Sequence, residues 1–290
     1  MIKKCKVVIV GNCQAAPLGR VLALLSSDVE VLNIATVHKL ADDDEAYFSK
    51  DFMEADYIIS QPISENYRCK FVRTNVLQKK FNNKLIKVVN LYYAGYHPDW
   101  AYIKDNNGVI VTGPMTDYHN KTILNGWKED KGITEIVADL NSIKYNEDRY
   151  TNLIRSTIDE LETRESEVDV CITDLIKSEC QNQQLFFTFN HPSKFLLVEY
   201  AKRILSHINM QFVTTEIAKL KEPLDRIILP INPASNINKR PRVIKGVDFT
   251  SNESGLLQFS NDPRVYSEED LVSVFLQVYE SALIEGTMEK

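Results

Sequence analysis

The chain has 290 residues, 44% of them hydrophobic, and its 34 basic and 40 acidic side chains give a net charge of -6. This composition is typical of a globular protein and excludes a strongly basic nucleic-acid-binding surface. The nearest approach to a basic cluster is the run KRPR at 239–242, which we expect to be a solvated loop. No stretch approaches the roughly 20 apolar residues of a membrane span, so no transmembrane segment is expected.

The first hundred residues alternate short β-branched runs with helical patterns, which is typical of a parallel sheet covered by helices. Pro17 fits this reading, because proline is tolerated in the first turn of a helix. We therefore predict an α/β fold with three layers, in which a mostly parallel sheet is flanked by helices. The expected strands are 7–10, 29–34, 57–59 and 85–91, and the expected helices are 14–26, 44–55 and 66–81.

The second half of the chain is less regular. Residues 108–113 fit either a strand or a loop, and 150–181 is helical and charged. Residues 185–189 predict one more strand of the sheet, followed by a helix. Near the end, 230–241 is rich in Pro and Asn, and a helix is expected to begin after Ser267, where two glutamates suit a helix N-terminus.

These patterns favour a single domain over residues 1–290. Within it, 1–105 and 183–210 are expected to form the sheet core. Residues 106–182 would be a mainly helical insertion, and 211–290 a helical C-terminal extension.

The cysteines are scattered and odd in number, and they show neither a Cys-x-x-Cys pair nor a histidine at ligand spacing. We expect reduced thiols, a cytoplasmic location and no structural metal. The five are Cys5, Cys13, Cys69, Cys171 and Cys180.

Polar residues follow several predicted strands, at the edge where open parallel sheets bind their ligands. The fold would bring them to one rim. They are Gly11, Asn12, Cys13 and Gln14 after the first strand, Gln61 after the third, Asn90 and 92–97 after the fourth, and Asn190 and His191 after the late one.

Cys13 is the residue around which chemistry is most readily built. A thiol at a helix N-terminus faces unpaired N–H groups and the positive end of the helix dipole, both of which favour thiolate. His191, which ends a strand and precedes a proline, is the preferred base for it. The alternative is that Cys13 is a small buried hydrophobe.

Amide side chains at the same rim suit the stabilisation of negative charge. Asn12, Gln61 and Asn90 could each donate to a developing oxyanion, together with the backbone N–H of Cys13 or Gln14. Each amide could equally hold loop backbone in place.

The aromatic loop 96–100 contains His97, and its rings could bind a sugar or an adenine. Two common phosphate-binding motifs are absent from the sequence, namely Gly-x-Gly-x-x-Gly and the Walker-type Gly-Lys-Ser/Thr. A phosphatase loop of the type Cys-x5-Arg is also excluded, because six residues separate Cys13 from Arg20.

Taken together, four segments resemble the WcbI family of polysaccharide-biosynthesis proteins. The resemblance covers roughly residues 5 to 200, and the Gly-Asn-Cys-Gln run is its most specific part. The segments are 11–18 (GNCQAAPL), 60–62 (SQP), 92–99 (YYAGYHPD) and 189–192 (FNHP). The family is regarded as cytoplasmic acetyltransferases of capsule assembly that bind coenzyme A.

The resemblance implies a fold with distant likeness to the SGNH hydrolases, with Cys13 in place of their serine and His191 as its partner. Those enzymes carry Asp three residues before the histidine, whereas this chain carries Thr188. Asn190 or a distant carboxylate would then orient the ring.

On this resemblance the chain would move an acetyl group from acetyl-coenzyme A to a sugar hydroxyl of a surface polysaccharide. Cys13 would be acylated transiently or would position the thioester. The expected coenzyme-binding residues are Gly11, Gln14, Arg68, Tyr93 and His97, with Arg68 on the helix after Gln61.

Two alternatives keep the same site. A Cys-dependent esterase or thioesterase would use water as the acceptor, and a non-catalytic module would bind coenzyme A or a nucleotide within a glycan assembly complex. The sequence leaves the oligomeric state open, a homo-oligomer included.

Overall fold

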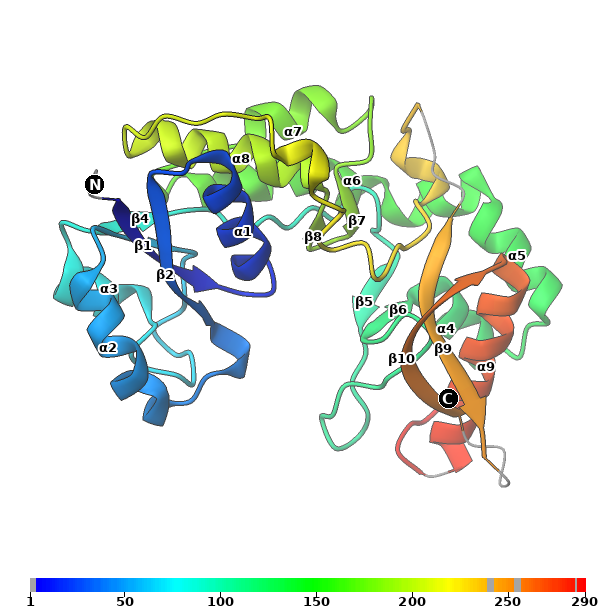
Figure 1. Ribbon diagram of the computed structural model, residues 1–290. Coiled ribbons are helices and arrows are strands. Elements are labelled where there is room, and N and C mark those ends of the chain that lie inside the picture. Colours follow the sequence, from blue (N-terminus) through cyan, green and yellow to red (C-terminus); the bar gives the residue numbers. More distant parts are fainter. Residues whose placement is uncertain (1–3, 239–242, 253–256, 285) are drawn as a thin grey trace. The chain divides into compact units, whose positions relative to one another are not determined.

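The structure is a computed structural model that describes residues 4–238, 243–252, 257–284 and 286–290 (Figure 1). The expected basic loop at 239–242 lies outside the described residues. Where one domain was expected, the chain divides into two compact units, each built from three segments. The first unit comprises Met1–Tyr92, Asp159–Glu179 and His191–Leu224, and the second comprises Tyr93–Ile158, Cys180–Asn190 and Asp225–Lys290.

The first unit is built on a four-stranded parallel sheet in the order β2-β1-β3-β4. The predicted parallel sheet is thereby confirmed, and the chain passes from β1 first to one side and then to the other. The strands are β1 (Cys5–Gly11), β2 (Val29–Thr36), β3 (Tyr57–Ser60) and β4 (Leu85–Lys87). The helices are α1 (Ala15–Leu25), α2 (Glu45–Glu54), α3 (Thr74–Phe81), α7 (Thr173–Glu179) and α8 (Lys194–His207), and a short strand, β8 (His191–Pro192), precedes α8.

Helices cover both faces of this sheet, because β1 is apolar on both sides. Val8 and Val10 pack into a core cluster with Phe48 of α2. Ile9 points the other way and lies against Gly19 of α1. Alternate residues of a strand face opposite sides of a sheet, so the three-layer arrangement follows from the continuous apolar run of β1.

The helix expected from residue 66 begins only at Thr74. The Ile63 N–H donates to Thr74 Oγ1 at 2.7 Å, and the Thr74 N–H donates to Ile63 O at 3.2 Å, which closes residues 63–74 into a loop. Phe71 and Val72 of this loop are buried in the core, which gave the segment its helix-like spacing. Arg68 therefore lies in a loop, not on a helix.

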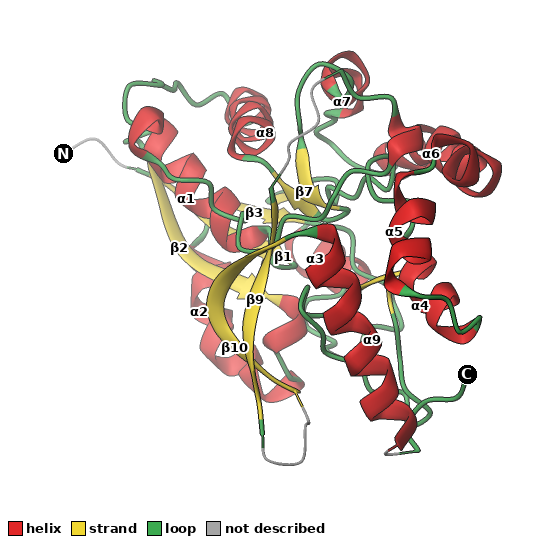
Figure 2. Ribbon diagram, turned by 90° about the vertical axis from the view of Figure 1, so that its right-hand side faces the viewer, coloured by secondary structure: helices red, strands yellow, loops and turns green. Residues whose placement is uncertain are grey.

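The second unit combines helices with small antiparallel sheets (Figure 2). Helix α6 (Ile143–Glu165) belongs to it as far as Ile158. Its other elements are β5 (Trp100–Tyr102), β6 (Tyr118–Asn120), α4 (Lys121–Lys128), α5 (Ile133–Asn141), β7 (Phe186–Thr188), β9 (Ile244–Ser251), β10 (Leu257–Tyr266) and α9 (Glu268–Ile284).

Two expectations for this half of the chain were wrong. The strand predicted at 185–189 forms as β7, but it is not a member of the parallel sheet. The C-terminal extension is not helical throughout, because β9 and β10 pair in a long antiparallel hairpin before α9. The start of α9 was predicted correctly, since Ser267 Oγ accepts the Asp270 N–H at 3.1 Å.

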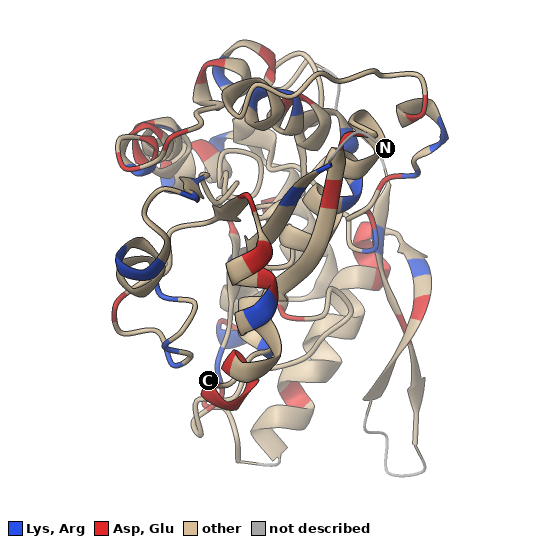
Figure 3. Cartoon of the chain, turned by 60° about the vertical axis from the view of Figure 1, so that its left-hand side comes forward, with Lys and Arg blue, Asp and Glu red and all other residues tan. Residues whose placement is uncertain are grey.

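Acidic and basic residues are interspersed along the helices and loops (Figure 3). Among the described residues, no helix is both long and apolar enough to cross a membrane. The same residues contain no group of three or more His, Cys, Asp or Glu side chains arranged to hold a metal ion.

Candidate active site

The predicted rim forms at the carboxyl ends of β1, β3 and β4 in the first unit (Figure 1). Because the chain leaves β1 for β2 on one side and returns to β3 on the other, the crevice between β1 and β3 is a topological switch point. Asn12, Cys13 and Gln14 follow β1 there, and Gln61 directly follows β3.

A network of side-chain amides joins these loops. The Asn12 N–H donates to Gln61 Oε1 at 2.9 Å, and Gln61 Nε2 donates to Gln14 Oε1 at 2.9 Å. Gln14 Nε2 in turn donates to Leu91 O at 2.7 Å, so the network reaches the loop after β4. Gln14 and Gln61 are both buried. These hydrogen bonds of Gln14 and Gln61 go to protein partners, so the two side chains join the three loops.

Asn12 and Asn90 occupy the more open part of the network. Asn12 Nδ2 donates to Asn90 Oδ1 at 2.9 Å, while Asn12 Oδ1 accepts the Gln14 N–H at 2.9 Å. Asn90 Nδ2 donates to no described residue. Its orientation is fixed through its carbonyl side, which leaves the NH₂ group as a positioned donor.

Arg164, at the end of α6, holds the loop that carries Asn90. Its guanidinium donates to Asn90 O at 3.1 Å and to Tyr92 O at 2.7 Å, and it lies 5.5 Å from the centre of the Tyr92 ring. Sequence reasoning missed this residue. No local pattern could have found it, because 73 residues separate it from Asn90 in the chain.

Cys13 is half-buried and lies two residues before α1. Burial raises the pKa of its thiol, and a hydrogen bond from its own backbone N–H offsets this only in part. The direction is opposite to the expected activation. Asn12 accepts the N–H groups of Gln14 and Ala15, so two donors that could have stabilised a thiolate are already paired. Of the donors named from sequence, the Cys13 N–H is the one that faces the sulfur.

His191 lies in β8, three residues before α8, and is half-buried. Burial lowers the pKa of its ring to about 4, so the imidazole is neutral at pH 7. Ser193 caps the helix that follows, accepting the Leu196 N–H at 3.4 Å.

Cys13 and His191 precede two helices that pack against each other, α1 and α8. The C-terminal ends of these helices are tied together, because Ser26 Oγ donates to Gln211 O at 2.7 Å and the Val213 N–H donates to Leu25 O at 2.8 Å. The N-terminal ends of α1 and α8 therefore also lie at one end of the helix pair.

The remaining predicted residues have other surroundings. Arg68 is exposed and donates to the backbone carbonyl of His38. Tyr93 and His97 belong to the second unit and are buried, His97 with 0% of its surface exposed. The Tyr93 ring stacks on Phe186 with centroids 5.5 Å apart. Burial lowers the pKa of His97 to about 3, so its ring is neutral at pH 7.

The side chain of Asn190, one candidate for orienting the His191 ring, has several hydrogen-bond partners. Its Oδ1 accepts from Tyr118 Oη at 2.7 Å and from Thr188 Oγ1 at 2.9 Å, and its Nδ2 donates to Tyr102 Oη at 3.1 Å. Both ends of the amide are thus held by residues of the second unit.

Comparison with known proteins gives one family and one solved structure. The family described as polysaccharide biosynthesis enzyme WcbI matches residues 6–212. A solved WcbI structure, described as the native protein without a disulfide bond between coenzyme A and one of its cysteines, matches with a TM-score of 0.73 and 19% sequence identity. The match covers 98% of this chain and 94% of that one. None of the curated proteins matches the chain.

Proposed function

Because the chain belongs to the WcbI family of polysaccharide biosynthesis enzymes, we propose that it transfers an acetyl group from acetyl-coenzyme A to a sugar hydroxyl. The observation that carries the proposal is the donor set around Cys13. The half-buried Cys13 directly follows Asn12, whose side chain donates to Asn90, and the NH₂ group of Asn90 has no described partner. Such donors stabilise the negative charge that develops on a carbonyl oxygen during acyl transfer.

Coenzyme A fits this position by chemistry. The description of the similar structure concerns a disulfide between coenzyme A and a cysteine, so in that protein the coenzyme thiol meets a cysteine thiol. Cys13 is our candidate for the corresponding residue here. When bound, acetyl-coenzyme A supplies a thioester whose carbonyl carbon is the electrophile. The exposed Arg68 stays our candidate for its phosphates.

Asn90 and the Cys13 N–H hold the carbonyl oxygen of the acetyl group. Gln61, Gln14 and Arg164 keep these two donors in place through the loops that they join. In this proposal Asn90 contacts the substrate, and the buried amides of Gln14 and Gln61 hold it in position. Asn12, whose Nδ2 orients Asn90, acts between the two groups.

His191 handles the proton. Its ring is neutral at pH 7 because burial lowers its pKa to about 4, so it can accept the proton of the sugar hydroxyl as the new C–O bond forms. It returns that proton to the coenzyme sulfur as the C–S bond breaks. If Cys13 is acylated on the way, His191 takes the thiol proton first.

The directions of the two pKa shifts determine the protonation states of Cys13 and His191 before substrate binds. Burial raises the pKa of Cys13 and lowers that of His191, so the thiol and imidazole are both neutral before substrate binds. A preformed thiolate–imidazolium pair, as in many Cys-dependent hydrolases, is therefore disfavoured. Proton transfer to His191 then occurs only when the reacting group is in place. The likeness to the SGNH hydrolases remains part of the proposal.

All five cysteines are free thiols in the described residues. Free thiols are typical of proteins in a reducing compartment, which supports our placing the reaction in the cytoplasm.

The test is an acetyl-transfer assay with a sugar panel, scored by mass spectrometry of the sugar and by release of coenzyme A. Acetylated sugar, lost in Cys13→Ala and Asn90→Ala but retained in the exposed control Asn125→Ala, is expected. Release of coenzyme A at the same rate without sugar would identify a thioesterase. Binding of coenzyme A without turnover on any sugar would identify a non-catalytic module.

A further inference from the structure

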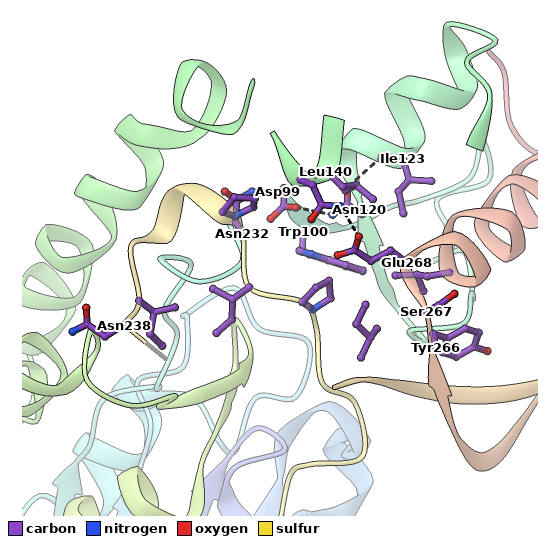
Figure 4. A pocket seen from close by; sticks show the side chains of 17 residues that line it. Asp99, Trp100, Asn120, Ile123, Leu140, Asn232, Asn238, Tyr266, Ser267 and Glu268 are labelled. Atoms are coloured by element: carbon purple, nitrogen blue, oxygen red, sulfur yellow. Dashed lines mark hydrogen bonds between the residues drawn. The ribbon is translucent and has the colours of Figure 1, made fainter. Parts of the chain in front are cut away.

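The second unit contains a cavity of about 710 Å³ (Figure 4). It is bounded by the start of β5, the first turn of α4, the end of α5, residues 230–238 and the junction of β10 with α9. Its volume lies in the range of natural small-molecule sites, about 300–1,000 Å³. The site around Cys13 uses none of the residues that line it.

Asp99 places a carboxylate with spare hydrogen-bonding capacity in the wall of this cavity. The residue is only 4% exposed, and its Oδ2 accepts from Asn120 Nδ2 at 2.7 Å. Its Oδ1 accepts no hydrogen bond of ordinary geometry from a described residue. A buried acceptor without a donor is costly, so a ligand hydroxyl that donated to it would recover that cost.

Trp100, the next residue, offers the complementary group. It is also 4% exposed, and its Nε1–H donates to no described residue. An unpaired acceptor and an unpaired donor thus come from consecutive residues of the same cavity wall. A hydroxyl group both donates and accepts, so a ligand bearing neighbouring hydroxyls matches this pair.

The rest of the described lining mixes apolar side chains with polar ones and includes no lysine or arginine. Glu268 adds a second carboxylate, which accepts from Asn141 Nδ2, and the asparagines Asn232 and Asn238 add amides (Figure 4). Phosphate and carboxylate ligands are bound chiefly by cations, which the described lining does not supply. The basic run 239–242, between the lining residues Asn238 and Ile244, lies outside the described residues. Carboxylates, amides and aromatic rings together suit the hydroxyls and the C–H faces of a pyranose.

We propose that this cavity binds an uncharged saccharide, with Asp99 and Glu268 accepting from its hydroxyl groups and Trp100 donating to one of its oxygens. That the bound saccharide is the acceptor of the acetyl group rests on the proposed function. Saccharide binding itself does not, since it depends only on residues of the second unit.

The test is saturation-transfer NMR of the full chain with glucose, galactose, mannose, N-acetylglucosamine and maltose, and with glucose 6-phosphate as the matched anionic probe. At least one neutral sugar should receive saturation, and the phosphate should weaken binding relative to glucose. Failure of every neutral sugar to bind, or tighter binding of glucose 6-phosphate than of any of them, would overturn the proposal.

Two variants locate the binding. Glu268→Gln keeps the size of the side chain but removes its charge, and we expect about tenfold weaker binding, the usual consequence of losing a charge-assisted hydrogen bond. Glu269→Gln, on the adjacent exposed residue, is the matched control and should bind as wild type does. Equal affinities in the two variants would place the saccharide elsewhere. If Glu268→Gln fails to fold, the sugar affinity of Asp99→Asn, a second variant of the cavity wall, is measured instead.

A Cys13→Ser variant separates this inference from the proposed function. It should bind the neutral sugar as wild type does, because Cys13 lies outside the cavity. Sugar binding by the wild-type protein without any acetyl transfer would contradict the proposed reaction and still support the saccharide site. Weaker sugar binding in Glu268→Gln with unchanged acetyl transfer would support the saccharide site and show that its sugar is not the acetyl acceptor.

Discussion

Gln61 lies so close to Gly11 that a Cβ built on residue 11 would be 2.7 Å from Gln61 Oε1. The same oxygen accepts the Asn12 N–H, so the absence of a side chain at Gly11 is what allows the loops after β1 and β3 to join. This is a close-approach requirement, and not a matter of backbone dihedral angles.

Gly11→Ala should therefore lower the free energy of unfolding by about 1–3 kcal/mol, the usual cost of overpacking a buried contact. The measurement is urea unfolding of a double-mutant cycle with Gln61→Ala. Alanine at position 61 removes the atoms that clash, so Gly11→Ala should cost much less in that background. Additive effects of the two substitutions would contradict the account.

The sheet of the first unit could be predicted because its strands carry a strong local signal. Val7–Val10 form a continuous apolar run, and a strand buried on both faces requires one. The hairpin β9–β10 was missed, because β10 reads LQFSNDPRVY, with polar residues and a proline inside it. Part of its support is tertiary: a Cβ on Gly246 would be 2.2 Å from Pro114 O, a contact that no local pattern reveals.

The candidate site was predicted in part for the same reason. Residues that directly follow strands, such as Cys13 and Gln61, are placed by topology alone. The burial of His97 could not be predicted, because an aromatic loop has the same composition whether its rings face a ligand or the core. Burial depends on packing across the whole second unit.

Asn90 should be essential for turnover if it holds the carbonyl oxygen. Asn90→Asp keeps the size and the acceptor that Asn12 Nδ2 contacts, but removes the free NH₂ donor. We expect kcat of acetyl transfer to fall by roughly 10²–10³, as for other lost oxyanion donors, with a smaller change in KM. The exposed residue Asn125 provides the control Asn125→Asp. A rise in KM alone would make Asn90 a binding residue.

Thiol labelling reports on the state of Cys13. Burial raises the pKa of Cys13, and burial together with the carboxylates of Glu165 and Asp174 raises that of Cys171. Of the three thiols compared, Cys171 is exposed, Cys13 is half-buried and Cys69 is fully buried. With iodoacetamide at neutral pH we expect Cys171 to be labelled fastest, Cys13 more slowly, and Cys69 only on unfolding. Peptide mass spectrometry gives the three rates. Coenzyme A should slow labelling of Cys13 and leave Cys171 unchanged; equal protection of both thiols would argue against a site at Cys13.

The pH dependence of acetyl transfer should reveal the buried environment of His191. The imidazole accepts a proton only when neutral, so activity is lost as pH falls through its pKa, which burial lowers to about 4. The acidic limb of kcat/KM should lie near that value, provided the protein stays folded there. His191→Ala should lower kcat by roughly 10²–10⁴, the range of a lost general base, and the exposed control His207→Ala should not. A limb near 6.5, the value of an unperturbed histidine, would contradict the lowered pKa of His191.

Asp99 should contribute more to the free energy of unfolding at mildly acidic pH than at neutral pH. Burial raises its pKa from 3.8 to about 6, although the Asn120 amide acts in the opposite direction. Between these two pH values the folded state binds more protons at this residue than the unfolded state does. Its contribution to the free energy of unfolding is therefore fully favourable below pH 3.8 and is lost as pH rises through 6.

Asp99→Asn removes that dependence, since the amide has no charge to bury and still offers an oxygen to Asn120 Nδ2. Above pH 6 the variant should gain up to about 3 kcal/mol of stability over wild type, the equivalent of the shift in pKa at 1.36 kcal/mol per unit. The gain should shrink as pH falls toward 4. Urea unfolding of both proteins at a series of pH values measures the difference, in which all other titrating groups cancel. A gain in stability that does not change with pH would show that burial does not raise the pKa of Asp99. It would also contradict the description of Asp99 as a poorly solvated carboxylate in the cavity wall.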